Sequence, residues 1–183
     1  MSGHHLILGK LIDFITGETL DDTLDERYRQ KLARLLVKEK GYRKGEIQPR
    51  FELLAKAGDK SAIIKVDYII TISAKVCMII KYGPGSLVTR HQPALAAARL
   101  VVPYQVPFAV VTNGEDAETL ECSSGIVVAS GLESIIDKSR LNEHRQIVNF
   151  AAISQKQAEM ASRILYCYEV DDSCPCDETI CRL

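Results

Sequence analysis

The chain has 183 residues, of which 46% are hydrophobic and 26% charged, and its formal net charge is −1 at pH 7. These values are typical of a soluble globular domain with a substantial core, and they give no overall electrostatic drive toward nucleic acid. No stretch approaches the ~18 unbroken apolar residues of a membrane-spanning helix. The N-terminus also lacks the layout of a secretory signal. We therefore expect a cytoplasmic protein that does not enter the membrane and whose cysteines are reduced.

The first elements predicted along the chain are helical. Residues 1–23 are expected to form a helical extension, with a short apolar helix over residues 5–15. Thr23 or Asp25 then caps a longer helix that ends near Gly41. The apolar face of this longer helix is formed by Tyr28, Leu32, Leu35 and Leu36.

The middle of the chain predicts a mixed β-sheet flanked by helices. Strands are expected over residues 47–54, 61–72, 75–81, 107–112 and 117–121. Pro49 favours an edge position for the first strand, and Pro93 fits the first turn of a helix over residues 93–102. Gly125 and Gly131 mark an irregular region, and residues 153–168 form a last amphipathic helix.

Two strand residues are candidate catalytic groups. Because side chains alternate between the faces of a strand, Asp67 and Lys81 can converge at one end of the sheet, beside a helix that opens at Gln92. An aspartate that binds Mg²⁺ and a lysine that neutralises developing charge are groups that phosphodiester hydrolysis uses. A second carboxylate would be needed two residues before the lysine, where the chain has Ile79. Simpler roles stay open, because Asp67 can accept backbone hydrogen bonds and Lys81 can extend to solvent.

A glycine-rich loop and a basic segment bear on ligand binding. The loop "GPGS" at residues 83–86 predicts a turn, but it can also wrap an anion at a helix N-terminus. The side chains that would contribute there are Lys81, Ser86, Thr89, Arg90 and His91. Residues 26–44 hold eight Lys or Arg against two Glu, which permits phosphate binding but is also typical of a solvated helix face.

The order of these elements resembles a known family. The segments that carry the resemblance are "RYRQKLARLLVKEKGY", the strand with Asp67, the strand that ends at Lys81, the helix from Gln92, and "VPFAVVTNGEDAETLECSSG". Over about residues 24–135 they resemble the N-terminal nuclease domain of the R subunit of type I restriction enzymes, in the PD-(D/E)XK nuclease superfamily. The resemblance implies a restriction-endonuclease-like α/β fold that handles DNA and uses Mg²⁺. It implies catalytic roles for Asp67, Lys81 and Gln92, with Asp67 as a metal ligand.

The sequence departs from that family at two positions of its motifs. Ile79 replaces the glutamate of the E-x-K element, and Ala96 replaces the tyrosine of the Q-x-x-x-Y element. We therefore expect a degraded metal site that binds DNA and cleaves it weakly or not at all. One alternative is an active Mg²⁺-dependent endonuclease in which Glu52 or Glu26 supplies the missing carboxylate. The other is a regulatory protein without enzymatic activity that binds an anion or a partner chain.

The C-terminal segment carries four cysteines, Cys167, Cys174, Cys176 and Cys181. Their spacing, C-x6-C-x-C-x4-C, matches no strong zinc or iron–sulfur motif, and five acids lie between residues 169 and 178, so we expect no metal site there. Residues 24–153 are expected to form the main domain, and residues 154–183 a C-terminal helix with a cysteine-containing acidic tail. A homodimer or partner subunits are compatible with the sequence.

Overall fold

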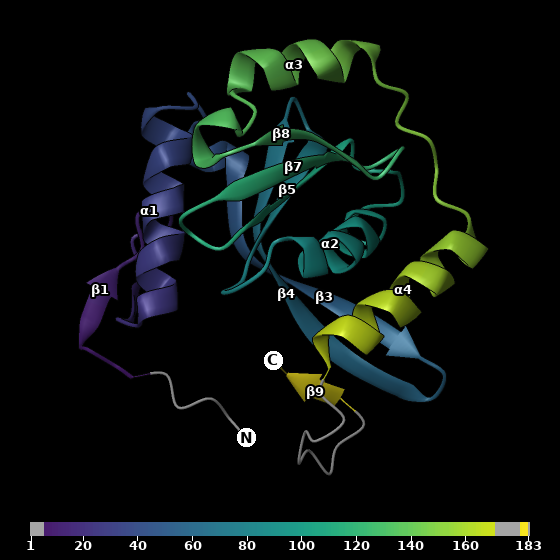
Figure 1. Cartoon of the computed structure of the whole chain (residues 1–183), viewed down its shortest axis with the longest axis horizontal. Coiled ribbons are helices and arrows are strands. Elements are labelled where there is room, and N and C mark those ends of the chain that lie inside the picture. The colour runs from purple at the N-terminus through teal and green to yellow at the C-terminus, as the bar shows by residue number, and fades with distance from the viewer. Residues whose placement is uncertain (1–5, 171–179, 183) are drawn as a thin grey trace.

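The computed structural model describes residues 6–170 and the backbone of residues 180–182, and it shows a mixed α/β fold (Figure 1). The helices are α1 (Leu24–Lys38), α2 (His91–Ala98), α3 (Lys138–Ile147) and α4 (Gln155–Glu169). The strands are β1 (Lys10–Ile12), β2 (Thr19–Asp21), β3 (Ile47–Ala57), β4 (Lys60–Ile72), β5 (Lys75–Tyr82), β6 (Phe108–Thr112), β7 (Ala117–Glu121), β8 (Ile126–Ser130) and β9 (Ile180–Arg182). Short 3₁₀ turns lie at Lys44–Glu46, Val88–Arg90 and Leu132–Ser134.

The main sheet is mixed, as predicted from the sequence. Its strands follow the order β3-β4-β5-β6-β7-β8, and β9 pairs in parallel with the start of β4. Only β5 and β6 are parallel along that path, and α2 forms the crossover between them. The remaining pairs on that path are antiparallel. β3 lies at one edge, where the missing N–H of Pro49 can be accommodated.

Helices cover both faces of the sheet, and each face has its own core. On one face α2 and α4 pack over a core that includes Ile69, Ile79 and Leu165. On the other face Leu36 of α1 and Leu141 of α3 belong to a core that includes Ile80 of β5. Figure 1 shows this layering, with α1 on one side of the sheet and α2 and α4 on the opposite side.

Several local predictions agree with the structure. Thr23 caps α1, because its hydroxyl oxygen accepts a hydrogen bond from the backbone N–H of Glu26 at 3.1 Å. Ser73 and Ala74 form the β4–β5 turn with positive φ values of 48° and 61°. These left-handed backbone conformations match the right-handed twist of strands joined by a two-residue hairpin turn. α4 begins at a capping box built by Ser154 and extends one residue beyond the predicted helix.

The helix predicted over residues 5–15 is wrong, because the described residues of this segment form β1 and the start of the turn that leads into β2. Leu11 of β1 pairs with Leu20 of β2. Gly17 has a φ of 80°, and the Asp13 carboxylate accepts hydrogen bonds from the backbone N–H groups of Ile15 and Thr16, which closes the turn. The apolar residues of this segment therefore reflect strand pairing and a side-chain-capped turn instead of a helix.

Two further elements were not predicted. β8 occupies the region between Gly125 and Gly131 that was expected to be irregular, and it forms the second edge of the sheet. Asp137 caps the N-terminus of α3, because its carboxylate accepts a hydrogen bond from the backbone N–H of Arg140. Only Leu141 is buried in α3, so its sequence has almost no apolar periodicity to detect. None of the helices in the described part of the chain is long and apolar enough to cross a membrane.

Candidate anion-binding site

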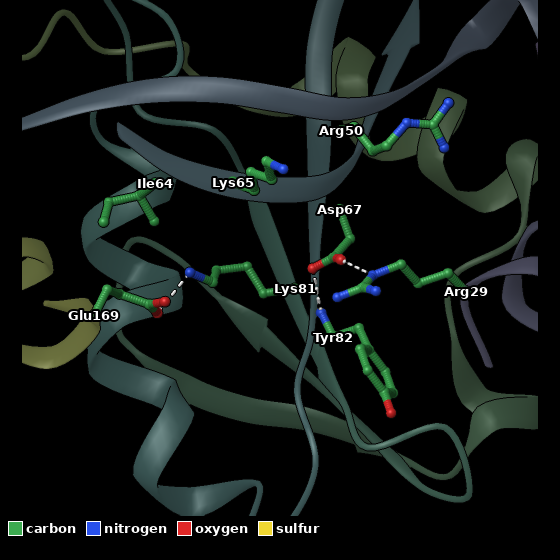
Figure 2. A pocket seen from close by; sticks show the side chains of 8 residues that line it. All are labelled: Arg29, Arg50, Ile64, Lys65, Asp67, Lys81, Tyr82 and Glu169. Carbon is green, nitrogen blue, oxygen red and sulfur yellow. Dashed lines mark hydrogen bonds and ion pairs between the residues drawn. The ribbon is translucent and has the colours of Figure 1, made fainter. Parts of the chain in front are cut away.

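A pocket of about 290 Å³ lies where α1, the β3–β5 strands and the end of α4 come together. It is lined by Arg29, Arg50, Ile64, Lys65, Asp67, Lys81, Tyr82 and Glu169. Figure 2 shows these side chains. As expected from strand alternation, Asp67 and Lys81 lie on adjacent strands and line the same pocket. The antiparallel register explains this arrangement, because Tyr68 pairs with Ile80 and the two candidates are the next residues outward.

Asp67 is 7% exposed and is held by two donors. Its Oδ1 atom accepts from Arg29 Nε at 2.6 Å, and its Oδ2 atom accepts from the backbone N–H of Tyr82 at 2.7 Å. The second bond fastens the end of β5 to β4 (Figure 2). A carboxylate can accept about four hydrogen bonds, so the contacts with these two donors leave part of its capacity open.

Arg29 brings a cation from α1 to this aspartate. Its guanidinium also lies over the Tyr82 ring, 5.0 Å from the centroid, and is 3.7 Å from Glu26. Burial alone would lower the pKa of Arg29, but the charge of Asp67 and its hydrogen bond outweigh that effect and raise the pKa. Arg29 is therefore a permanent positive charge beside the aspartate that the sequence predicts as a metal ligand.

Lys81 is 4% exposed at the end of β5, and its ammonium points away from Asp67 (Figure 2). Its Nζ atom donates to Glu169 Oε1 at 2.6 Å. Glu169 is the last residue of α4, and the sequence reasoning missed it. The acidic end of the last predicted helix was the only available signal, and nothing in the sequence placed that helix end beside Lys81.

Ile79, which stands where the second carboxylate would be needed, is buried in the hydrophobic core. Ile79 has no exposed surface and packs in the same cluster as Ile69 and α2. Neither proposed substitute reaches the pocket, because Glu52 is exposed on β3 and Glu26 bonds to Gln30. Among the described residues, no three His, Cys, Asp or Glu side chains gather in a way that could hold a metal ion. With one carboxylate paired to Arg29 and another paired to Lys81, the donor set does not fit Mg²⁺.

Two more basic residues line the pocket. Arg50 has a positive φ of 51°, and its guanidinium bonds to Asp13 and Glu18 outside the pocket. Lys65 is exposed and pairs with none of the described residues. The pocket lining thus holds two cations paired with its own acids, Arg29 with Asp67 and Lys81 with Glu169, together with Lys65, while the charge of Arg50 is balanced outside the pocket.

The glycine loop and the start of α2 do not share this pocket. Gln92 is exposed on α2 and does not line the pocket. His91 Nε2 lies 2.6 Å from Glu118 Oε2, and the Thr89 hydroxyl donates to the Ser86 carbonyl at 3.0 Å. The predicted catalytic role of Gln92 and the predicted anion-binding roles of Ser86, Thr89 and His91 stay predictions.

Arg90 folds back onto the same loop. Its NH2 atom donates to the Pro84 carbonyl at 2.8 Å, and its guanidinium lies against Gly83, where an added Cβ would come within 2.2 Å of Cζ. A Cβ at position 83 would displace the end of the flexible Arg90 side chain. Arg90 thus stabilises the turn in this structure, and its nitrogens do not line the pocket of Asp67 and Lys81.

The cysteines divide between the core and the C-terminal segment. Cys77 and Cys122 are buried, and burial raises the pKa of Cys122 to about 12, so both behave as small core residues. Cys167 is an exposed free thiol. Cys174 and Cys176 lie outside the described residues, as does the side chain of Cys181, so the expectation about a metal site there stays a prediction.

One comparison with known proteins found a match. A family model described as "Type I restriction enzyme R protein N terminus (HSDR_N)" matches residues 24–135, which is more than half of the chain. This match confirms the family resemblance in the sequence and includes α1 and β3 to β8. No curated protein and no solved structure matches the chain.

Proposed function

We propose that this chain, which belongs to the type I restriction enzyme R protein N-terminal family, binds the phosphate backbone of DNA at the pocket of Asp67 and Lys81. The observation that carries the proposal is that three cations, Arg29, Lys65 and Lys81, line the pocket with two acids, Asp67 and Glu169. The fourth lining cation, Arg50, is neutralised by Asp13 and Glu18 outside the pocket. Arg29 and Lys81 come from different elements and are held in place by ion pairs. Preorganised cations of this kind suit a phosphate, whose oxygens accept charge-assisted hydrogen bonds.

In this proposal the fold is that of the PD-(D/E)XK nucleases, and its metal centre is degraded. Ile79 supplies no ligand, and the Arg29 guanidinium lies where it would repel a cation bound by Asp67. DNA cleavage with Mg²⁺ is then absent or marginal. The residues act by binding and orienting a phosphate, and no chemical step is assigned to them.

Salt dependence tests the binding proposal directly. Affinity for a short fluorescein-labelled duplex is measured by fluorescence anisotropy at several salt concentrations, for the wild type, Lys81→Ala and Lys156→Ala. Lys156 is an exposed control at the opposite end of α4 from Glu169. Each phosphate contact that is lost lowers the salt slope by about one unit, so Lys81→Ala flattens the slope and Lys156→Ala does not. Equal slopes for all three proteins would contradict phosphate binding at this pocket.

A second candidate function is an active Mg²⁺-dependent endonuclease with a relocated carboxylate. The observation that favours it is that Glu169 lines the same pocket as Asp67, so that its carboxylate, once released from Lys81, would supply the second ligand. A plasmid-nicking assay with Mg²⁺ or Mn²⁺ distinguishes the two functions. Nicking by the wild type that is lost in both Asp67→Asn and Glu169→Gln would support the relocated site. No nicking by the wild type agrees with the degraded centre.

A further inference from the structure

We propose that Glu169 is an internal counterion that competes with the phosphate for Lys81, so that the end of α4 lowers the pocket's affinity until the Glu169 side chain is displaced. This inference deepens the proposed function and rests on it. In wild-type protein a phosphate oxygen takes the place of the Glu169 carboxylate at the Lys81 ammonium. Glu169 thereby sets how tightly the pocket holds its ligand.

The first argument is the burial of Lys81. Its side chain is only 5% exposed, so its positive charge is largely removed from water. A buried ammonium needs an anion beside it, because the cost of leaving the charge unpaired is high. Among the described residues the only such anion in contact is Glu169, at 2.6 Å. An external phosphate that approaches Lys81 therefore has to exchange with this carboxylate.

The second argument is that Glu169 can leave more easily than Asp67 can. Its side chain is 21% exposed, and it lies at the C-terminus of α4, where the helix dipole disfavours negative charge. α4 is anchored upstream by the buried residues Ala161 and Leu165, so the helix does not depend on Glu169 for its packing. The departure of Glu169 from Lys81 requires rotation of one partly exposed side chain at a helix end.

Asp67 provides the contrast within the same pocket. Its carboxylate accepts from Arg29 and from the backbone N–H of Tyr82, so moving it would leave a buried backbone donor unpaired. In Figure 2 Lys81 reaches toward Glu169 and away from Asp67. A phosphate at the Glu169 position would still lie in the pocket that Lys65 and Arg29 line. The exchange therefore leaves the Asp67 side of the site intact.

The test compares Glu169→Gln with the wild type, using the same labelled duplex at one salt concentration and inorganic phosphate as a competitor. The substitution keeps the shape of the side chain and removes its charge. If Lys81 is available in about a tenth of wild-type molecules, removal of the competing charge tightens duplex binding about tenfold. Lys81→Met introduced into Glu169→Gln should abolish this gain, and inorganic phosphate should displace the duplex from Glu169→Gln at lower concentration than a chloride control of equal ionic strength.

Three outcomes are informative. Tighter binding by Glu169→Gln that depends on Lys81 supports the inference. If Lys81→Met weakens wild-type binding but Glu169→Gln leaves it unchanged, the pocket binds phosphate and the counterion role is wrong. If Lys81→Met weakens neither protein, both the inference and the proposed function fail.

A second variant guards against misfolding of Glu169→Gln. Glu169→Asp keeps the charge but shortens the side chain, so the ion pair with Lys81 is weakened without removal of the acid. Binding by this variant should be tighter than wild-type binding by a smaller factor than in Glu169→Gln. Thermal unfolding of each variant checks that it is folded. A folded Glu169→Asp that binds no more tightly than the wild type would overturn the inference on its own.

Discussion

Two buried aspartates in this protein, Asp13 and Asp67, are each bound by an arginine, yet their surroundings differ. Asp13 is 1% exposed and Asp67 is 7% exposed. Asp13 accepts hydrogen bonds from four groups, the N–H groups of Ile15 and Thr16 and the side chains of Gln30 and Arg50. Asp67 accepts from Arg29 and the N–H of Tyr82. The first carboxylate has used about all of its acceptor capacity, whereas the second has not.

The comparison shows how a structural carboxylate can be separated from a candidate functional one. Asp13 joins the β1–β2 hairpin to α1 through Gln30 and to β3 through Arg50, and it does not line the pocket. Asp67 lines the pocket beside Lys81. Burial and an arginine partner are common to both residues. Spare hydrogen-bond capacity that faces a pocket is what distinguishes Asp67.

The largest expected effect is on stability, from Asp13→Ala. This change leaves four donors without their acceptor, and Arg50 loses the closest of its acidic partners. We therefore expect the free energy of unfolding to fall by about 4 kcal/mol. Asp67→Ala removes the acceptor of two donors and should cost about 2 kcal/mol. Urea denaturation followed by circular dichroism measures both. Equal losses of the free energy of unfolding in the two variants would contradict the distinction between a carboxylate whose acceptor capacity is filled and one with spare capacity.

The next effect concerns the residue that replaces the missing ligand. Ile79→Glu places a carboxylate at a position with no exposed surface, within an apolar cluster, and we expect a loss of about 3 kcal/mol with no gain in Mg²⁺-dependent nicking. Ile79→Val is the matched control and should cost about 1 kcal/mol. A stable Ile79→Glu that nicks plasmid DNA would mean that this position opens to the pocket, contrary to its packing.

The third effect is a dependence of stability on pH that belongs to Asp13. Burial alone would raise the pKa of its carboxyl, but hydrogen bonds from Arg50, Thr16 and Gln30 outweigh it and lower the pKa from 3.8 to about 2. A lowered pKa in the folded state contributes stability that is complete above the unfolded pKa and lost as the pH falls through the folded one.

Denaturation at a series of pH values measures this contribution. Between pH 3.8 and about 2 the Asp13 carboxyl should account for a loss of about 2 kcal/mol. Asp13→Asn is the control and should lack this component while it retains the contributions of the other carboxylates. An unchanged pH profile in Asp13→Asn would show that other groups account for the acid sensitivity.

The smallest expected effect on stability comes from Lys65→Ala at the mouth of the pocket. Lys65 is exposed and pairs with none of the described residues, so its removal should change the free energy of unfolding by less than about 0.5 kcal/mol. If a phosphate lies beside Asp67, the same change should lower the salt slope of DNA binding by about one unit. A loss of stability without a change in slope would assign Lys65 to the fold instead of the site.

Much of the sheet could be predicted from the sequence because its signals are local. The runs that form β4 and β5 are long, apolar and rich in isoleucine, and the turn between them is only two residues long. α1 has both an apolar face and a cap at Thr23. Strand alternation placed Asp67 and Lys81 on one face at one end of the sheet, provided that their strands are neighbours, and the structure pairs those strands. β1, β2, β8 and α3 were missed because short or solvent-facing elements carry little periodicity.

The partners of the candidate residues were decided only by the tertiary structure. Arg29 reaches Asp67 across 38 positions of sequence, and Lys81 reaches Glu169 across 88. Such pairs depend on how α1 and α4 dock on the sheet, and docking is set by the summed packing of apolar faces that are far apart in the chain. The sequence therefore determined which residues stand at the end of the sheet. Helix packing determined that a cation lies beside the aspartate and a carboxylate beside the lysine, because both charges are buried too deeply to remain unpaired.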